Sequence, residues 1–261
     1  MAVLTDKVIR DREFTSFQQL ADMTDVLIER CSFTGIFPDE GALKIRNCHN
    51  VEIRGCRFYG LTTSAIVVQS TTPSTNINIH NNDFWDIKGN GIITKFPNSG
   101  VRISYNRLWE VGADDKAHPL YIMTPGTIAE YNHIFGTTGD GITIRTEGIV
   151  RGNEIWNARK AAIRYFSDGH PRESSELIIE ENFCYGSGAG YPVISLLYGL
   201  GTMLERYLVS RNRIISTNAT SPAFQVQSSQ FAGKEIFLND NIAWGELKKT
   251  YVTKHWGNVE N

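Results

Sequence analysis

One short pattern recurs along most of the chain and limits what it can fold into. It consists of an aliphatic residue, a second residue three positions later and an apolar residue two positions after that, as in Ile79, Asn82 and Phe84. The middle positions of its nine copies are Cys31, Cys56, Asn82, Asn106, Asn132, Asn153, Asn182, Asn212 and Asn241. The interval between them ranges from 21 residues, Asn132 to Asn153, to 30 residues, Asn182 to Asn212.

A repeat of this length predicts a solenoid, because a unit too small to bury its own apolar side must stack on its neighbours. Apolar and polar residues alternate with a period of two, which indicates strands and excludes helical repeats. We therefore expect an all-β solenoid of about nine coils. Its strands should stack in parallel at about 4.8 Å, with the asparagines forming an internal ladder of side-chain amides.

The length and composition of the chain fit one such solenoid. Its 261 residues are 41% hydrophobic and 21% charged, which suits a single elongated core. We predict that residues 25–245 form the coils. Because the open ends of a stack expose unpaired strand edges, we expect residues 1–24 to cap one end and residues 246–261 to form a cap or tail at the other.

Charge and hydropathy narrow the choice of partners. A formal net charge of −2 gives no general reason to expect nucleic acid as a partner. The first residues lack the features of a secretory signal, and no later segment is long and apolar enough to span a bilayer, so we expect no membrane partner. These features are compatible with a cytoplasmic protein, a virion-associated protein or a secreted protein from which a signal was trimmed.

The four cysteines do not form a disulfide framework in a chain of this size. Cys31 and Cys56 occupy ladder positions in adjacent coils, so a bridge between them is possible in principle, but we expect free thiols in place of asparagine. No spacing of cysteine and histidine suggests a zinc site. We expect no metal and no cofactor.

A second strand signal lies about midway between successive ladder positions. Alternate side chains of a strand face opposite sides, so the second and fourth residues of these segments should face outward and stack into two columns. One predicted column is Lys44, Val67, Ile93, Tyr121, Thr143, Arg164, Ser195 and Gln225. The other is Arg46, Gln69, Lys95, Met123, Arg145, Phe166, Leu197 and Gln227.

Two connections flank this outward face and carry polar residues suited to a site, because a rigid scaffold usually displays function on its loops. Residues 111–118, which include Asp115 and His118, enter one of its strands, and residues 167–175 leave another.

The chain resembles the right-handed parallel β-helix superfamily of pectate lyases over residues of roughly 25–245, where the asparagine ladder lies. The segment from His118 to Tyr121, followed one coil later by residues 139–145 ending in Arg145, is similar to the histidine and arginine pair of the mannuronan carbon-5 epimerase and alginate lyase branch. That resemblance implies an acidic polysaccharide as partner. A histidine would take a proton next to a uronate carboxylate, and an arginine would neutralise the carboxylate. A calcium ion, as in pectate lyases, is possible but not indicated, since the outward columns contain no carboxylate.

β-Elimination of a uronan requires a group that neutralises the carboxylate, a base for the adjacent proton and an acid for the leaving oxygen. Arg145 suits the first task, His118 the second, and Tyr121 could act as acid or second base. We therefore predict His118, Tyr121 and Arg145 as catalytic residues. The predicted substrate-binding residues are Lys95, Arg164, Asp115, Phe166 and Asp140.

Three other functions fit the same scaffold. A glycoside hydrolase could use two of Asp114, Asp115 and Asp140 as a carboxylate pair. A non-catalytic β-helix could bind glycans or serve as part of a viral fibre or an envelope-assembly factor, because the fold alone does not determine activity. The third possibility is an isomerase or cyclase of small molecules.

Overall fold

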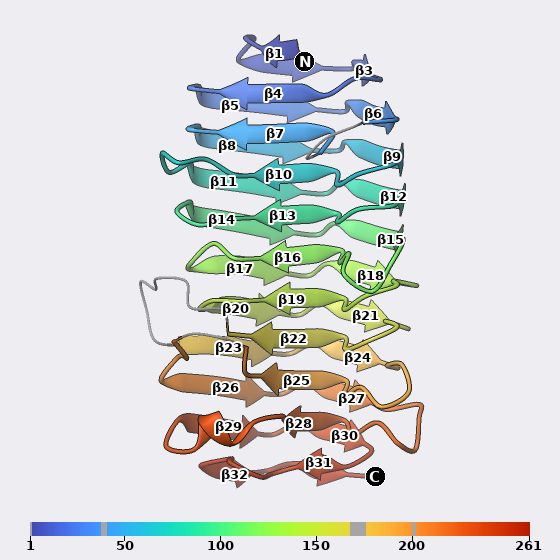
Figure 1. Ribbon diagram of the computed structural model, residues 1–261, viewed down its shortest axis with the longest axis vertical. Helices are drawn as coiled ribbons and strands as arrows, with labels where there is room; N and C mark the ends of the chain where they lie inside the picture. The colour runs from blue at the N-terminus through green and yellow to red at the C-terminus, as the bar shows by residue number, and fades with distance from the viewer. Residues whose placement is uncertain (1, 38–40, 168–175, 200–201) are drawn as a thin grey trace.

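The computed structural model describes residues 2–37, 41–167, 176–199 and 202–261. The chain winds into a column of flat coils, each contributing one strand to each of three parallel sheets (Figure 1). Each sheet contains eleven described strands. The predicted all-β parallel β-helix is thus confirmed.

The first sheet faces the viewer in Figure 1. Its strands are β1 (Ala2–Leu4), β4 (Gln18–Ala21), β7 (Leu43–Arg46), β10 (Ile66–Val68), β13 (Ile92–Thr94), β16 (Leu120–Ile122), β19 (Ile142–Ile144), β22 (Ile163–Phe166), β25 (Ile194–Leu197), β28 (Phe224–Val226) and β31 (Leu247–Lys248).

The second sheet lies behind the first. Its strands are β2 (Val8–Arg10), β5 (Thr24–Glu29), β8 (His49–Arg54), β11 (Thr75–His80), β14 (Ser99–Ser104), β17 (Thr127–Glu130), β20 (Gly148–Arg151), β23 (Glu176–Glu180), β26 (Arg206–Ser210), β29 (Glu235–Asn239) and β32 (Lys254–Trp256).

The third sheet forms the right-hand edge of Figure 1. Its strands are β3 (Glu13–Phe14), β6 (Ser32–Gly35), β9 (Arg57–Leu61), β12 (Asp83–Ile87), β15 (Arg107–Val111), β18 (His133–Phe135), β21 (Glu154–Trp156), β24 (Phe183–Tyr185), β27 (Arg213–Ile215), β30 (Ile242–Trp244) and β33 (Val259–Glu260). A short 3-10 helix, η1 (Ser229–Phe231), is the one helix in the described part of the chain, where no helix has the length and apolar character needed to cross a membrane.

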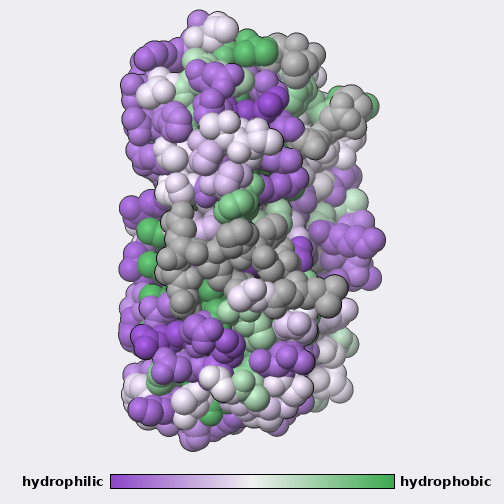
Figure 2. All heavy atoms as spheres, turned by 60° about the vertical axis from the view of Figure 1, so that its left-hand side comes forward, coloured by the Kyte–Doolittle hydropathy of each residue, from purple (hydrophilic) through white to green (hydrophobic). Residues whose placement is uncertain are grey.

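The recurring pattern explains the interior of the coils. Its aliphatic residue, such as Ile79, lies near the end of a second-sheet strand, and its apolar residue, such as Phe84, lies near the start of a third-sheet strand; both side chains are fully buried. Aromatic residues at the latter position stack inside the first coils, with ring centroids 4.6–4.9 Å apart: Phe14, Phe33, Phe58 and Phe84. Hydrophilic residues cover most of the visible surface outside the grey atoms in Figure 2.

The ladder asparagines lie at the corner between the second and third sheets and bond to each other from coil to coil. The backbone N–H of Asn106 donates to Oδ1 of Asn132 at 3.1 Å, and its side-chain Nδ2 donates both to that oxygen at 3.0 Å and to the Ile79 carbonyl at 2.9 Å. Each ladder asparagine therefore pairs backbone groups of the preceding coil with its side chain, as Asn106 does for the Asn82 N–H and the Ile79 carbonyl, and also bonds to the side chain of the next ladder residue. Cys56 accepts at this corner through sulfur, and Cys31 and Cys56 are both free thiols, as expected.

The coils extend beyond the nine marked copies at both ends. Residues 2–21 form strands β1 to β4, and residues 247–260 form β31 to β33, all paired in register with their neighbours. The ladder continues to Asn258, whose Oδ1 accepts the Asn241 N–H at 3.0 Å. The coils and the ladder thus continue beyond residue 245, the predicted end of the coils. Whether these two terminal coils act as caps stays a prediction.

The two outward columns of the first sheet have the predicted register. Tyr121 pairs with Ile93 on one side and Thr143 on the other, and Thr143 pairs with Arg164. The side chains of Tyr121, Thr143 and Arg164 therefore follow one another along the column on neighbouring coils.

Replacing a central ladder asparagine should destabilise the protein more than replacing the terminal one. Asn132→Ala removes the acceptor of a buried backbone N–H and several side-chain hydrogen bonds, so we expect a loss of about 2–4 kcal/mol in the free energy of unfolding. Asn258→Ala is the matched control, because the hydrogen bonds of Asn258 are only partly buried, and it should lose much less. Urea unfolding followed by circular dichroism measures both, and equal losses would contradict the central role of the ladder.

Candidate active site

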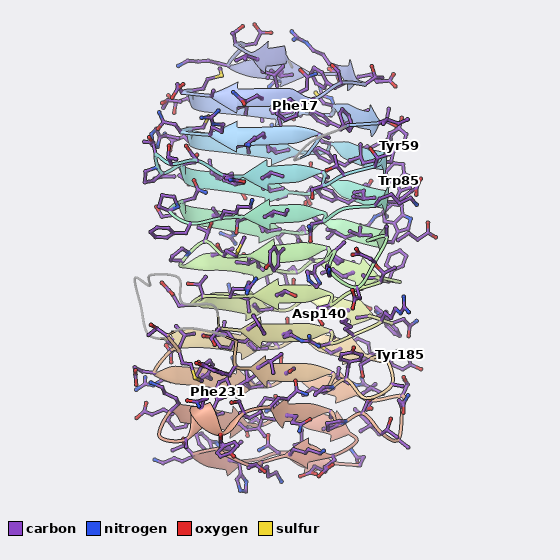
Figure 3. All side chains as sticks on the ribbon, viewed as in Figure 1. Phe17, Tyr59, Trp85, Asp140, Tyr185 and Phe231 are labelled. Atoms are coloured by element: carbon purple, nitrogen blue, oxygen red, sulfur yellow. The ribbon has the colours of Figure 1, made fainter. Side chains whose placement is uncertain are left out.

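A hollow of about 350 Å³ lies on the first sheet over strands β16, β19 and β22. Asp140 marks its position in Figure 3. The hollow brings together every predicted site residue except Lys95. Its lining residues are Asp115, Lys116, His118, Tyr121, Asp140, Thr143, Arg145, Lys160, Arg164 and Phe166.

Asp140 is the buried centre of this group, with 2% of its surface exposed. Its Oδ1 accepts the Ala161 backbone N–H at 3.0 Å and lies 3.2 Å from a guanidinium nitrogen of Arg164. Its Oδ2 accepts the Thr143 hydroxyl at 2.9 Å and lies 3.8 Å from Nδ1 of His118, too far for a hydrogen bond. The carboxylate therefore holds the side chains of Thr143 and Arg164, on two consecutive coils, in fixed positions.

The His118 ring is held by a backbone amide. Its Nδ1 accepts the Asp140 N–H at 3.0 Å, so in the neutral ring the proton lies on Nε2. Burial lowers the pKa of His118 below its ordinary value, although the Asp140 carboxylate opposes this effect. Gly139 permits the close approach, because a Cβ there would lie 2.7 Å from Nδ1 and 2.3 Å from the Ala117 carbonyl oxygen.

Tyr121 and Arg145 contact each other on adjacent coils. An Nη1 N–H of Arg145 donates to the Tyr121 hydroxyl oxygen, and the guanidinium carbon lies 5.5 Å from the centre of the Tyr121 ring and 4.7 Å from that of Phe166. The His118 and Tyr121 rings lie side by side with centroids 5.4 Å apart. The three predicted catalytic residues thus form one contiguous group.

Asp115 lies at the rim of the hollow rather than beside His118. Its Oδ2 is 2.9 Å from Nζ of Lys160, and this hydrogen bond lowers the pKa of Asp115. Nζ of Lys160 also lies 5.8 Å from the centre of the Tyr191 ring, which is 5.5 Å from the guanidinium of Arg164.

Thr143 and Lys160 also line the hollow, although the sequence pattern did not single them out. Thr143 lay in a predicted outward column, where its register with Tyr121 and Arg164 could have drawn attention to it. Lys160 lies in a connection between strands, where the sequence pattern gives no signal.

Lys95 lies on an earlier coil and belongs to a different hollow. Its Nζ donates to Oε1 of Gln69 at 2.6 Å. That hollow, of about 550 Å³, is also lined by Lys44 and Arg46, so Lys95 is separated from the group around Asp140. Of the flanking connection 167–175, residues 168–175 lie outside the described residues.

In the described residues, no group of three or more His, Cys, Asp or Glu side chains is arranged to hold a metal ion. The possible calcium ion stays a prediction.

The sequence of residues 16–184 matches the family model described as the right handed beta helix region, and the chain belongs to this family. Among solved structures, the fold is similar to that of the A-module of mannuronan C-5 epimerase AlgE6 from Azotobacter vinelandii, with a TM-score of 0.57 and 13% sequence identity. The match covers 97% of this chain and 73% of the epimerase module, and at that identity it shows a shared fold. No curated protein matches the sequence.

The position of the His118 proton can be tested directly. Nitrogen NMR of the imidazole should show a neutral ring protonated on Nε2 at neutral pH, because the Asp140 amide occupies Nδ1. As the pH falls below about 6.5, the ordinary value for histidine, the unfolded chain takes up a proton that folded His118 resists, so the free energy of unfolding should decrease.

His118→Gln should make the free energy of unfolding depend less on pH. His255→Gln, which replaces an exposed histidine, is the control and should not have this effect. A ring protonated on Nδ1 at neutral pH would contradict the assignment.

Proposed function

We propose that this protein is a lyase or epimerase of a uronate-containing polysaccharide that acts by moving the proton next to the uronate carboxylate. The observation that carries the proposal is the meeting of His118, Tyr121 and Arg145 in one hollow on the first sheet. The similarity in fold to a mannuronan C-5 epimerase module supports a polysaccharide as substrate.

Arg145 is the group proposed to receive the uronate carboxylate. A guanidinium offers paired N–H donors to a carboxylate, and neutralising that charge makes the proton on the adjacent carbon more acidic. The Phe166 ring beside it can pack against a sugar face. Arg164 lies against the Asp140 carboxylate and is proposed to hold that group in place.

The hydrogen bonds of His118 and Tyr121 indicate which of the two accepts the substrate proton. With Nδ1 of His118 occupied, the neutral ring presents an N–H and acts as a donor to the substrate rather than as its base. Tyr121 is then the better proton acceptor, because the Arg145 N–H on its oxygen stabilises negative charge there. We therefore assign the proton transfer to Tyr121 and the positioning of the sugar to His118.

Both reactions start with the same step. The ionised Tyr121 oxygen takes the proton, and the electron pair of the broken C–H bond moves toward the carboxylate held by Arg145. A lyase then expels the neighbouring glycosidic oxygen, which takes up the proton from Tyr121, and leaves a carbon–carbon double bond. An epimerase returns a proton to the opposite face of the same carbon.

The proposal predicts activity on at least one of alginate, pectate or a glycosaminoglycan. Ultraviolet absorbance of the unsaturated product detects lyase activity, and deuterium incorporation next to the carboxylate, followed by NMR, detects epimerase activity. Tyr121→Phe and Arg145→Ala should each lower turnover by at least about 100-fold, since one removes the proton acceptor and the other the carboxylate partner.

Arg206→Ala is the matched control for Arg145→Ala, because Arg206 lies on β26 in the second sheet with about half of its side chain exposed. It should retain full activity. If no uronan reacts in either assay, the proposal is wrong, and binding without turnover would favour a non-catalytic glycan-binding protein.

A further inference from the structure

The outward face of the third sheet carries a column of aromatic side chains that the proposed function does not use. Three of the five tryptophans of the chain belong to it. Figure 3 shows Tyr59, Trp85 and Tyr185 along the right-hand edge, away from Asp140. From β9 to β24 the column is Tyr59, Trp85, Trp109, Phe135, Trp156 and Tyr185.

The first four rings of this column form a parallel stack. Successive centroids lie 4.7, 5.1 and 5.8 Å apart, and neighbouring ring planes are within 6° of parallel. Rings inside such a stack cover each other's faces and present only their edges to solvent. Trp85 and Trp109 therefore stabilise the sheet but offer no open face to a ligand.

The parallel stack ends at Phe135. Trp156 pairs with Phe135 in the sheet, but its indole N–H donates to Oε1 of Glu154 at 2.8 Å and its ring is tilted 39° from that of Tyr185. Among the described residues the ring of Phe135 contacts that of Trp109 but not that of Trp156, and 43% of Phe135 is exposed.

A hollow of about 340 Å³ lies at this break in the stack, lined by Arg107, Trp109, His133, Phe135 and Trp156. Its volume is near the lower end of small-ligand sites, enough for a single ring and its substituents. The open aromatic face and the hollow therefore occur at the same place.

Two polar side chains that line the hollow lie beside carboxylates of neighbouring residues. Nε of Arg107 lies 2.8 Å from Oδ1 of Asp83, and Nδ1 of His133 lies 3.1 Å from Oε2 of Glu154. Such a rim offers both hydrogen-bond donors and acceptors to a ligand. It complements an uncharged ring with hydroxyl groups better than an anion, which would meet two carboxylates.

We propose that this hollow binds one uncharged pyranose unit of a glycan, with the C–H face of the sugar on Phe135 and its hydroxyls toward Arg107, His133 and Glu154. A pyranose has the required combination of an apolar face and a polar edge. The site lies on a different sheet from the group around Asp140 and does not depend on its chemistry.

Titration of the protein with lactose, maltose, cellobiose and mannobiose tests the proposal. The indole N–H signals of Trp109 and Trp156 in a nitrogen–proton NMR spectrum should shift with at least one sugar, because both rings line the hollow. Phe135→Ala and Phe135→Leu should each weaken binding by about ten-fold, since both remove the aromatic face. The leucine variant keeps apolar volume and guards against loss of folding.

Trp85→Phe is the matched control, because it alters a ring inside the stack and should leave binding unchanged. The proposal is overturned if no sugar shifts the two indole signals, or if Phe135→Leu binds as tightly as the unchanged protein. Binding of an acidic disaccharide but of no neutral one, or of an aromatic peptide alone, would equally overturn it. These measurements need no turnover, so they are independent of the activity assays.

Discussion

The side-chain amide at the corner between the second and third sheets is the interaction on which the rest of this fold depends. In every coil the residue before it adopts a left-handed conformation, which is costly for most residue types at about 1–2 kcal/mol. These residues are Asp11, Arg30, Gly55, Asn81, Tyr105, Tyr131, Gly152, Glu181, Arg211, Asp240 and Gly257. The bonds between ladder asparagines offset that cost, because they pair backbone groups that the sharp turn would otherwise leave buried and unpaired.

The same corner explains how much of the fold could be predicted from the sequence. Once each ladder residue fixes the phase of its coil, the strand half a coil away can be assigned face by face, and the predicted column through Tyr121, Thr143 and Arg164 has the observed register. The terminal coils escaped notice because the pattern changes there. Arg12 replaces asparagine at one end, and at the other His255 and Glu260 flank Asn258 where apolar residues are expected; coils next to solvent need fewer apolar side chains.

The grouping of the candidate site was predictable only in part. Register placed Tyr121 near Arg145 and Arg164, but it could not show that Asp140 would tie the group together or that Lys160 would reach Asp115. Nor could it determine the protonated nitrogen of His118, because that depends on one backbone amide in three dimensions. Lys95 shows the converse error, since a residue of the correct outward column, on the coil next to Tyr121, can still line a different hollow.

The residues of the candidate site come from several coils rather than from one, which limits where coils can be added during evolution without separating them. Tyr121 and Arg145 come from successive strands of one sheet. Duplicating one whole coil between them would preserve the solenoid but move the two side chains apart by about 4.8 Å more. A duplication anywhere outside β16 to β22 would lengthen the surface and leave the site intact. The number of coils and the residues of the candidate site can therefore change independently during evolution, except across those three strands.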